Sequence, residues 1–292
     1  MKISKYNASG NDFVIFTDSV KEDRSKLARE LCDRREGVGA DGLIVVLPKF
    51  NGIDGINFEW EFYNSDGSTA DMCGNGSRAV CMYAYENFLA GKSMKFLSSA
   101  GVIDGEIFGI FGGNLNGGMQ GELRNVSFGE IFNLRDNAHA LVANVEVMLV
   151  QPKRLGESFD EAGRTWYFYN TGAPHLVTFT EDLSEFDIAL ARELGEKYNA
   201  NVNYALVQKR VANVILKVRT YERGAEAETL ACSTGMAACF IASVENMGLV
   251  ADMRVVPASG EMLNLRLASN GKIYFRGDVR HTFNGEFIGY VE

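Results

Sequence analysis

The chain has 292 residues, of which 46% are hydrophobic and 23% charged, an ordinary composition for a globular protein. Its net charge of −9 argues against a nucleic-acid partner and offers no basic face to an anionic membrane. The apolar segments are roughly 5–8 residues long, well short of the roughly 20 that span a bilayer. Residues 1–4 lead directly into a strand-like pattern, without the apolar stretch of a signal peptide. We therefore expect a cytoplasmic protein.

Alternation of apolar and polar residues predicts strands, in chain order at 1–6, 13–17, 43–47, 56–62, 142–150, 203–208, 214–221 and 273–276. Helical periodicity predicts helices at 26–35, 75–89, 188–197 and 234–247, with Gly91 and Gly248 as C-caps. The glycine-rich stretch 109–118 suggests a hairpin loop, and the polar stretch 133–140 a linker. Because strands and helices do not alternate regularly, the pattern favours an α+β fold.

Five cysteines in a chain of this length do not make a disulfide scaffold. No Cys-x-x-Cys pair is present, so the sequence predicts no metal site. We expect Cys32, Cys81 and Cys239 to be reduced, buried thiols with packing roles, as is usual for free cysteine.

The two halves of the chain repeat one order of motifs. The pentapeptide Leu-Ala-Arg-Glu-Leu occurs at 27–31 and again at 190–194, and an alternating strand follows each copy. The aromatic residues that end these strands, Phe62 and Tyr221, each precede a cysteine by eleven residues, namely Cys73 and Cys232. This repeat predicts an internal duplication with two pseudo-symmetric domains and a cleft between them.

Each of these two cysteines directly precedes a predicted helix. The positive end of a helix dipole favours the thiolate form of a cysteine placed there, and the amides of the first helical turn bind anions. Two such sites that converge would hold one carboxylate from both sides. One thiolate would then remove the proton beside that carboxylate while the opposite thiol delivers a proton to the other face. Inversion needs two bases because a single base tends to return the proton to the side it came from.

At these motifs the chain resembles the diaminopimelate epimerases. The matching segments span nearly the whole chain: ASGNDF (8–13), GVGAD (37–41), FYNSDGS (62–68), MCGNGSR (72–78), GAPH (172–175), YERG (221–224) and ETLAC (228–232). The resemblance implies epimerisation of LL- to meso-diaminopimelate without a cofactor, on the bacterial route to lysine and peptidoglycan.

The resemblance also implies two pseudo-symmetric domains, each a mixed, mostly antiparallel β-sheet curled around a central helix, with the active site in the cleft between them. The last strand would return to the first domain, so we expect one domain of residues 1–133 and 281–292 and a second of 134–280. Members of the family are commonly homodimers, and the expected ligand is a small amino acid.

Site roles are implied by position. Cys73 and Cys232 correspond to the acid–base pair. The backbone that holds the reacting carboxylate corresponds to Gly74, Asn75, Ser233 and Thr234. Residues that bind the substrate, chiefly at its distal end, correspond to Asn11, Asn64, Asn201, Glu222 and Arg223. His175 and Glu222 correspond to residues that tune the thiols.

Three positions depart from the commonest pattern of the family. Gly42 stands where many members have a glutamine, Ala173 replaces the asparagine of Gly-Asn-Pro-His, and Ser233 replaces a glycine. Gly42 and Ala173 leave open a racemase of the same fold with another substrate, such as histidine, diaminobutyrate or hydroxyproline. A non-catalytic amino-acid-binding protein is a third possibility, although binding alone does not need paired thiols.

Overall fold

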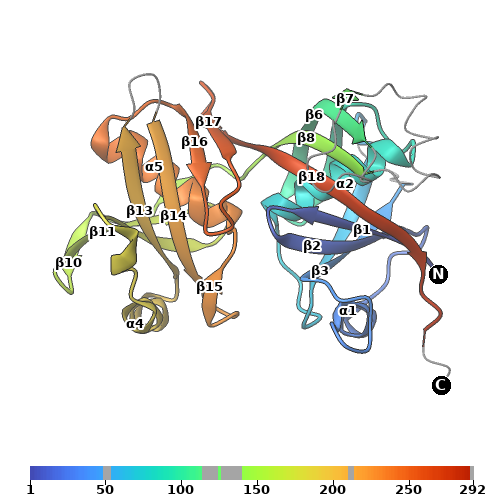
Figure 1. Ribbon diagram of the computed structural model, residues 1–292, viewed down its shortest axis with the longest axis horizontal. Helices are drawn as coiled ribbons and strands as arrows, with labels where there is room; N and C mark the ends of the chain where they lie inside the picture. Colours follow the sequence, from blue (N-terminus) through green and yellow to red (C-terminus); the bar gives the residue numbers. More distant parts are fainter. Residues whose placement is uncertain (49–53, 114–123, 126–139, 210–213, 290–292) are drawn as a thin grey trace. The chain divides into compact units, whose positions relative to one another are not determined.

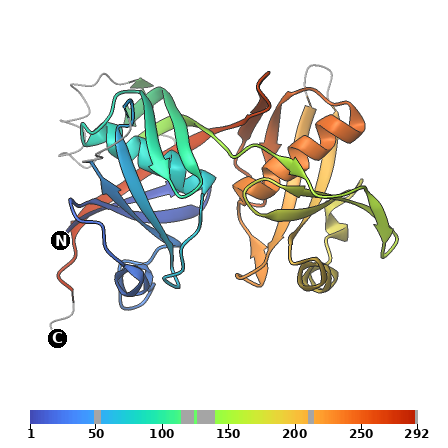
Figure 2. The ribbon, with the colours of Figure 1, turned by 180° about the vertical axis from the view of Figure 1, so that it is seen from behind.

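The computed structural model describes residues 1–48, 54–113, 124–125, 140–209 and 214–289. It divides into two compact units, one of Met1–Val147 with Gly277–Glu292 and one of Met148–Arg276. Figures 1 and 2 show that each unit is a curled sheet with one helix inside it, α2 in the first and α5 in the second. Among the described residues, no helix has the length and apolar character required to cross a membrane.

The strands of unit 1 close into a ring around α2. Neighbouring strands pair in the order β1, β2, β3, β4, β5, β6, β8, β18 and back to β1. Their bounds are β1 Lys2–Ala8, β2 Asn11–Thr17, β3 Gly42–Leu47, β4 Phe58–Asn64, β5 Ser93–Ser98, β6 Gly101–Gly113, β8 Ala140–Met148 and β18 Ile273–Glu286, with the short β7 Arg124–Asn125 beside β6. The last strand of the chain therefore closes the ring of the first unit, as the family resemblance implied.

Unit 2 repeats this pairing scheme. Parallel pairs β2–β3 and β4–β5 have counterparts in β12–β13 and β14–β16, and antiparallel pairs β3–β4 and β5–β6 have counterparts in β13–β14 and β16–β17. The bounds are β9 Lys153–Arg154, β10 Phe159–Glu161, β11 Arg164–Asn170, β12 Pro174–Phe179, β13 Asn201–Lys209, β14 Val214–Glu222, β15 Ala227–Thr229, β16 Asp252–Val256 and β17 Leu263–Leu267. The predicted α+β class and internal duplication are thus confirmed.

The two inner helices are α2, Gly74–Glu86, and α5, Ser233–Met247. All residues of α2 are buried, and most of α5 is. The two outer helices are α1, Ser25–Cys32, and α4, Ile188–Tyr198, and a 3-10 turn η1 covers Leu183–Glu185. Each of the four helices that the sequence predicts is therefore present among the described residues.

Two predicted helix ends are wrong. Helix α1 stops at Cys32, because the Asp33 side chain accepts hydrogen bonds from the backbone N–H groups of Arg35 and Glu36 (both 2.7 Å) and turns the chain out of the helix. Helix α2 stops at Glu86 and is not capped by Gly91. Phe88 adopts the left-handed conformation there (φ 59°), and the helix closes through hydrogen bonds from the residues that follow it.

The predicted loop at 109–118 is also wrong in its first half, because residues 109–113 extend β6 and pair with β8. Residues 114–118 and most of the expected linker at 133–140 lie outside the described residues. Strand β8 packs within unit 1 through this same pairing. The boundaries between the compact units therefore fall after residues 147 and 276, whereas the sequence led us to divide the chain after 133 and 280.

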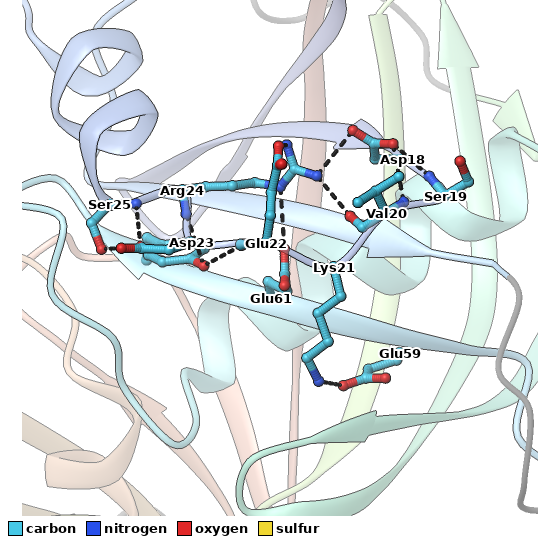
Figure 3. A network of polar contacts seen from close by, with 11 residues as sticks. Asp18, Ser19, Val20, Lys21, Glu22, Asp23, Arg24, Ser25, Glu59 and Glu61 are labelled. Carbon is cyan, nitrogen blue, oxygen red and sulfur yellow. Dashed lines mark hydrogen bonds and ion pairs between the residues drawn. The ribbon is translucent and has the colours of Figure 1, made fainter.

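A buried arginine fixes the start of α1 to the sheet of unit 1 (Figure 3). Arg24 is 5% exposed and binds the carboxylates of Asp18 (3.0 Å), Glu22 (3.0 Å) and Glu61 (3.2 Å), as well as the carbonyl of Val20 (2.7 Å). Glu61 belongs to β4. The helix is thereby anchored beside the strand that ends at Asn64.

Candidate active site

Cys73 is the N-cap residue of α2. Its backbone is extended, and its sulfur accepts a hydrogen bond from the amide of Gly76 at 3.4 Å. Gly74 and Asn75 form the first turn of the helix and are buried. The structure therefore confirms that a helix begins immediately after this thiol, the setting that favours a thiolate and binds anions.

Asn11 is the neighbour of Cys73 on β2. Its Oδ1 atom lies 3.9 Å from the sulfur and accepts a hydrogen bond from Asn75 at 3.4 Å. Its Nδ2 donates to Asp41 at 2.8 Å, which fixes the orientation of the amide so that its oxygen faces the thiol. Arg34 in turn binds Asp41 at 2.7 Å. Sequence reasoning missed Asp41 as a positioning group, although it lies in the GVGAD motif.

Asn75 is held by a fully buried arginine. Arg78 donates to Oδ1 of Asn75 (2.8 Å), to the hydroxyl of Ser9 (2.9 Å) and to the carbonyl of Asp278 on β18 (3.1 Å). A guanidinium supplies several donors in a fixed plane, so one side chain ties the first turns of α2 to two other segments. Arg78 ends the MCGNGSR motif (72–78), but nothing in the sequence indicates that it holds Asn75.

Asn64 ends β4 and begins the turn that follows this strand. Its backbone amide donates to the carbonyl of Ser68 at 2.8 Å, and its side chain donates to the Ser68 hydroxyl at 3.0 Å. Ser68 in turn donates to Asp66 at 2.6 Å. The Asn64 amide is thus held by the turn that follows it.

Cys232 has the equivalent position in unit 2, as the N-cap residue of α5. It is 8% exposed, and its sulfur lies 3.4 Å from the hydroxyl of Thr234. Ser233 is buried in the first turn beside it. Gly235 follows, where an added Cβ would lie only 2.4 Å from the side chain of Asn203. Close packing of the first turn therefore requires glycine at this position.

His175 reaches Cys232 through Thr234. The imidazole is fully buried on β12, with Nε2 2.9 Å from the Thr234 hydroxyl and Nδ1 3.2 Å from the amide of Asn203. Burial lowers the pKa of His175 to about 3, so the ring is neutral at physiological pH. Asn203 donates to Nδ1, because its oxygen accepts from Thr220 at 2.9 Å. Nε2 therefore carries the hydrogen that points at Thr234.

Glu222 and Arg223 lie at the end of β14, as predicted. The Arg223 amide donates to the Asn201 side chain at 2.9 Å, while the Arg223 side chain is exposed and Glu222 is half-buried. Asn201 begins β13 and lies opposite His175 in the parallel pairing with β12. The structure therefore gathers Asn201, Glu222 and Arg223 at one edge of the unit 2 sheet.

Two departures from the family pattern differ in their surroundings. Gly42 begins β3 in a crowded place, where an added Cβ would lie 2.9 Å from the carbonyl of Tyr63 and 3.2 Å from the ring of Phe62. A larger residue there requires a backbone shift. Ala173 is half-buried in the turn before β12, where its carbonyl accepts from the amide of Thr171.

The fold is shared with several solved structures. A PhzF-family phenazine biosynthesis protein of Bacillus anthracis aligns with a TM-score of 0.67 at 13% identity, over 99% of both chains. A probable proline racemase of Agrobacterium radiobacter K84 aligns with a TM-score of 0.65 at 11% identity, over 98% of this chain and 92% of the other. The chain therefore has the fold of the PhzF and proline racemase-like proteins.

The family model of diaminopimelate epimerase matches residues 3–114 and 167–282. A curated diaminopimelate epimerase of Nitratiruptor sp. is 47% identical over 97% of both chains, and one of Campylobacter lari is 45% identical over 98% of this chain and 99% of the other. The chain belongs to the diaminopimelate epimerase family and is an isomerase.

Proposed function

We propose that the protein converts LL-2,6-diaminopimelate to meso-diaminopimelate by inverting one α-carbon, with Cys73 and Cys232 as the two acid–base groups. The observation that carries this proposal is the equivalent position of the two cysteines. Each is the N-cap residue of the inner helix in one copy of a duplicated fold. The 47% identity to a curated family member supports the choice of substrate.

The reaction is a proton exchange on opposite faces of one carbon. One cysteine, as thiolate, takes the α-proton and becomes a thiol, and the electron pair delocalises into the carboxylate. The other cysteine, as thiol, gives its proton to the opposite face of the same carbon and becomes a thiolate. Two groups placed in this way each contribute roughly 10²–10⁴-fold to the rate, and the chemistry needs no cofactor or metal.

The reacting carboxylate would bind at the helix starts. We infer that the amides of Gly74 and Asn75 from one unit and of Ser233 and Thr234 from the other donate to it, because first-turn amides point along the helix axis toward an anion. Charge that develops on the carboxylate as the proton leaves would be stabilised by the same donors. The substitution of Ser233 for glycine keeps this amide.

The thiol of Cys232 would be tuned through Thr234. Since Nε2–H of His175 points at the Thr234 hydroxyl, that hydroxyl can direct its own hydrogen at the sulfur and stabilise the thiolate. Glu222 is half-buried and adjoins Arg223 at the end of β14, a position that suits the distal end of the substrate as well as a role near the thiol. We retain both roles as proposals.

The distal end of the substrate carries a second carboxylate and a second ammonium group. Arg223 would bind the carboxylate, since a guanidinium matches it with two parallel hydrogen bonds. Glu222 and the side-chain oxygens of Asn11, Asn64 and Asn201 would accept from the ammonium group. In this proposal the site lies in the cleft between the two domains, and the working enzyme is a cytoplasmic homodimer without a nucleic-acid or membrane partner.

The test is chiral analysis of LL-diaminopimelate incubated with purified protein in D₂O. We expect the meso isomer, with deuterium at the inverted carbon. L-histidine, L-diaminobutyrate and trans-4-hydroxy-L-proline serve as competitors for the alternative that Gly42 and Ala173 leave open. Inversion of one of these in preference to diaminopimelate would overturn the substrate assignment. Binding of diaminopimelate without deuterium exchange would overturn catalysis itself.

A further inference from the structure

The repeated pentapeptide Leu-Ala-Arg-Glu-Leu has no part in the site described so far. In both copies its alanine and second leucine are buried, as Ala28 and Leu31 in α1 and as Ala191 and Leu194 in α4. These residues explain why the helix packs against its sheet. They do not explain the arginine, which is exposed in both copies, as Arg29 and Arg192.

In unit 1, Arg29 reaches the turn that carries Asn64. Its Nη1 atom donates to the carbonyl of Asp66 at 3.4 Å. Gly67 packs closely here, since an added Cβ would lie 2.5 Å from both Nη1 of Arg29 and the carbonyl of Ser25. Gly67 also donates to the carbonyl of Asn64 at 2.9 Å. Arg29 therefore contacts the backbone of the same turn that holds Asn64, the residue proposed to bind substrate.

In unit 2, Arg192 makes the matching contact. Its Nη2 atom donates to the carbonyl of Glu226 at 3.3 Å, and its Nε atom lies 3.7 Å from the carboxylate of the same residue. Glu226 has a left-handed backbone (φ 52°), and its amide donates to the carbonyl of Glu222 at 3.0 Å. Its carboxylate also accepts from the hydroxyl of Tyr221. The turn that begins at Glu222 and Arg223 is thus closed on Glu226 and held there by Arg192.

We propose that Arg29 and Arg192 are positioning residues, each of which fixes the substrate-binding turn of its own unit from the outer helix. Both arginines come from the same position of an identical motif, and both donate to a backbone carbonyl in the turn after the equivalent strand. A backbone acceptor fits a positioning role, because the contact fixes the path of the chain whatever side chain the turn carries. The inference concerns the proposed substrate site and rests on the proposed function for its kinetic consequence.

The experiment compares Arg29→Ala and Arg192→Ala with control substitutions on the same helices, Lys26→Ala and Glu193→Ala, both at exposed positions. Amide hydrogen exchange is measured on the substrate-free protein. We expect faster exchange at residues 66–68 in the Arg29 variant and at 224–226 in the Arg192 variant. Neither arginine variant should change exchange in the turn of the other unit. The two control variants should exchange like wild type in both turns. Exchange that is unaltered in these turns, or that rises equally along the helix, would overturn the proposal.

Kinetics with diaminopimelate give the second readout. We expect KM to rise about two- to tenfold, the effect of one hydrogen bond, with kcat and the pH profile of the thiols unchanged. Arg29→Lys and Arg192→Lys, which keep one donor, should restore part of the loss. An unchanged KM, or an equal rise in the control variants, would contradict the positioning role. Wild-type protein that fails to turn over diaminopimelate would instead refute the proposed function, and the exchange result would still stand.

Discussion

The Nε2 atom of His175 lies 2.9 Å from the hydroxyl of Thr234, and this hydroxyl lies 3.4 Å from the sulfur of Cys232. The histidine is buried and neutral, so it acts as a fixed hydrogen-bond donor and not as a charge beside the thiol. Because the Thr234 hydroxyl accepts from Nε2–H, its own hydrogen can be donated to the sulfur. In the proposed mechanism, this hydroxyl therefore stabilises the thiolate of Cys232.

Thr234→Val should remove this hydroxyl while keeping the backbone amide and the side-chain volume. We expect the pKa that governs the rise of kcat/KM with pH to increase and the rate at neutral pH to fall about tenfold or more, because hydrogen bonds to charged groups contribute about 1.5–3 kcal/mol. Thr234→Ser is the matched control and should retain most activity. A valine variant with the wild-type pH profile would show that the thiol does not depend on this contact.

The buried imidazole of His175 should make stability depend on pH. Its pKa is lowered to about 3 in the folded state by burial, against about 6.5 in the unfolded chain. Between these values only the unfolded state binds the proton, so stability is fully present above about pH 6.5 and falls as pH is lowered toward 3. The loss approaches about 1.4 kcal/mol per pH unit.

His175→Gln should remove this component. Urea unfolding at pH 7.5 and pH 4.5 measures it, since the difference in stability between wild type and variant should shrink at the lower pH. If wild type and variant differed in stability by the same amount at pH 7.5 and at pH 4.5, the histidine would take up its proton in the folded state as readily as in the unfolded chain.

Arg223 should determine the preference of the enzyme for substrates that carry a distal carboxylate. Arg223→Met is expected to cost about 2–5 kcal/mol in kcat/KM for diaminopimelate if a desolvated charge pair is lost. The loss for an amino acid that lacks the distal carboxylate should be much smaller, and Arg223→Lys should lie between. Equal losses for both kinds of substrate would indicate a structural role for this arginine.

The five thiols should differ in reactivity. Burial raises the pKa of Cys32 to about 12 and raises the pKa values of Cys81 and Cys239 well above the ordinary range. Because alkylation requires the thiolate, iodoacetamide at pH 8 should label Cys73 first among the cysteines of the native protein. Peptide mapping after brief treatment measures this order. Early labelling of Cys32, Cys81 or Cys239 would contradict the burial of these three thiols.

Local patterns were sufficient to predict the four helices and to place Cys73 and Cys232 at the starts of two of them. The outer helices α1 and α4 bury one apolar face each, and each inner helix follows a cysteine that the internal repeat marks. The ends were less predictable, because the stop of α2 depends on a left-handed Phe88, a conformation that its residue type does not favour. The short strands β5 and β16 were missed, although buried and more exposed residues alternate along both.

The contacts that orient the site could not be read from the sequence. Asn203 meets His175 only because β12 and β13 pair in parallel, and Asp41 meets Asn11 only because β2 and β3 do. Arg78 reaches Asp278 across 200 positions of the chain. These partners are set by the pairing of distant strands, and no local spacing indicates them.

The central claim is that two thiols share one inversion. The test compares Cys73→Ala and Cys232→Ala with wild type for conversion of LL-diaminopimelate to the meso isomer. Circular dichroism checks that each variant has folded, and Cys81→Ala serves as a control outside the proposed site. We predict that each active-site variant loses nearly all epimerisation while the control retains it. Near-wild-type turnover by either Cys73→Ala or Cys232→Ala would contradict the two-base account.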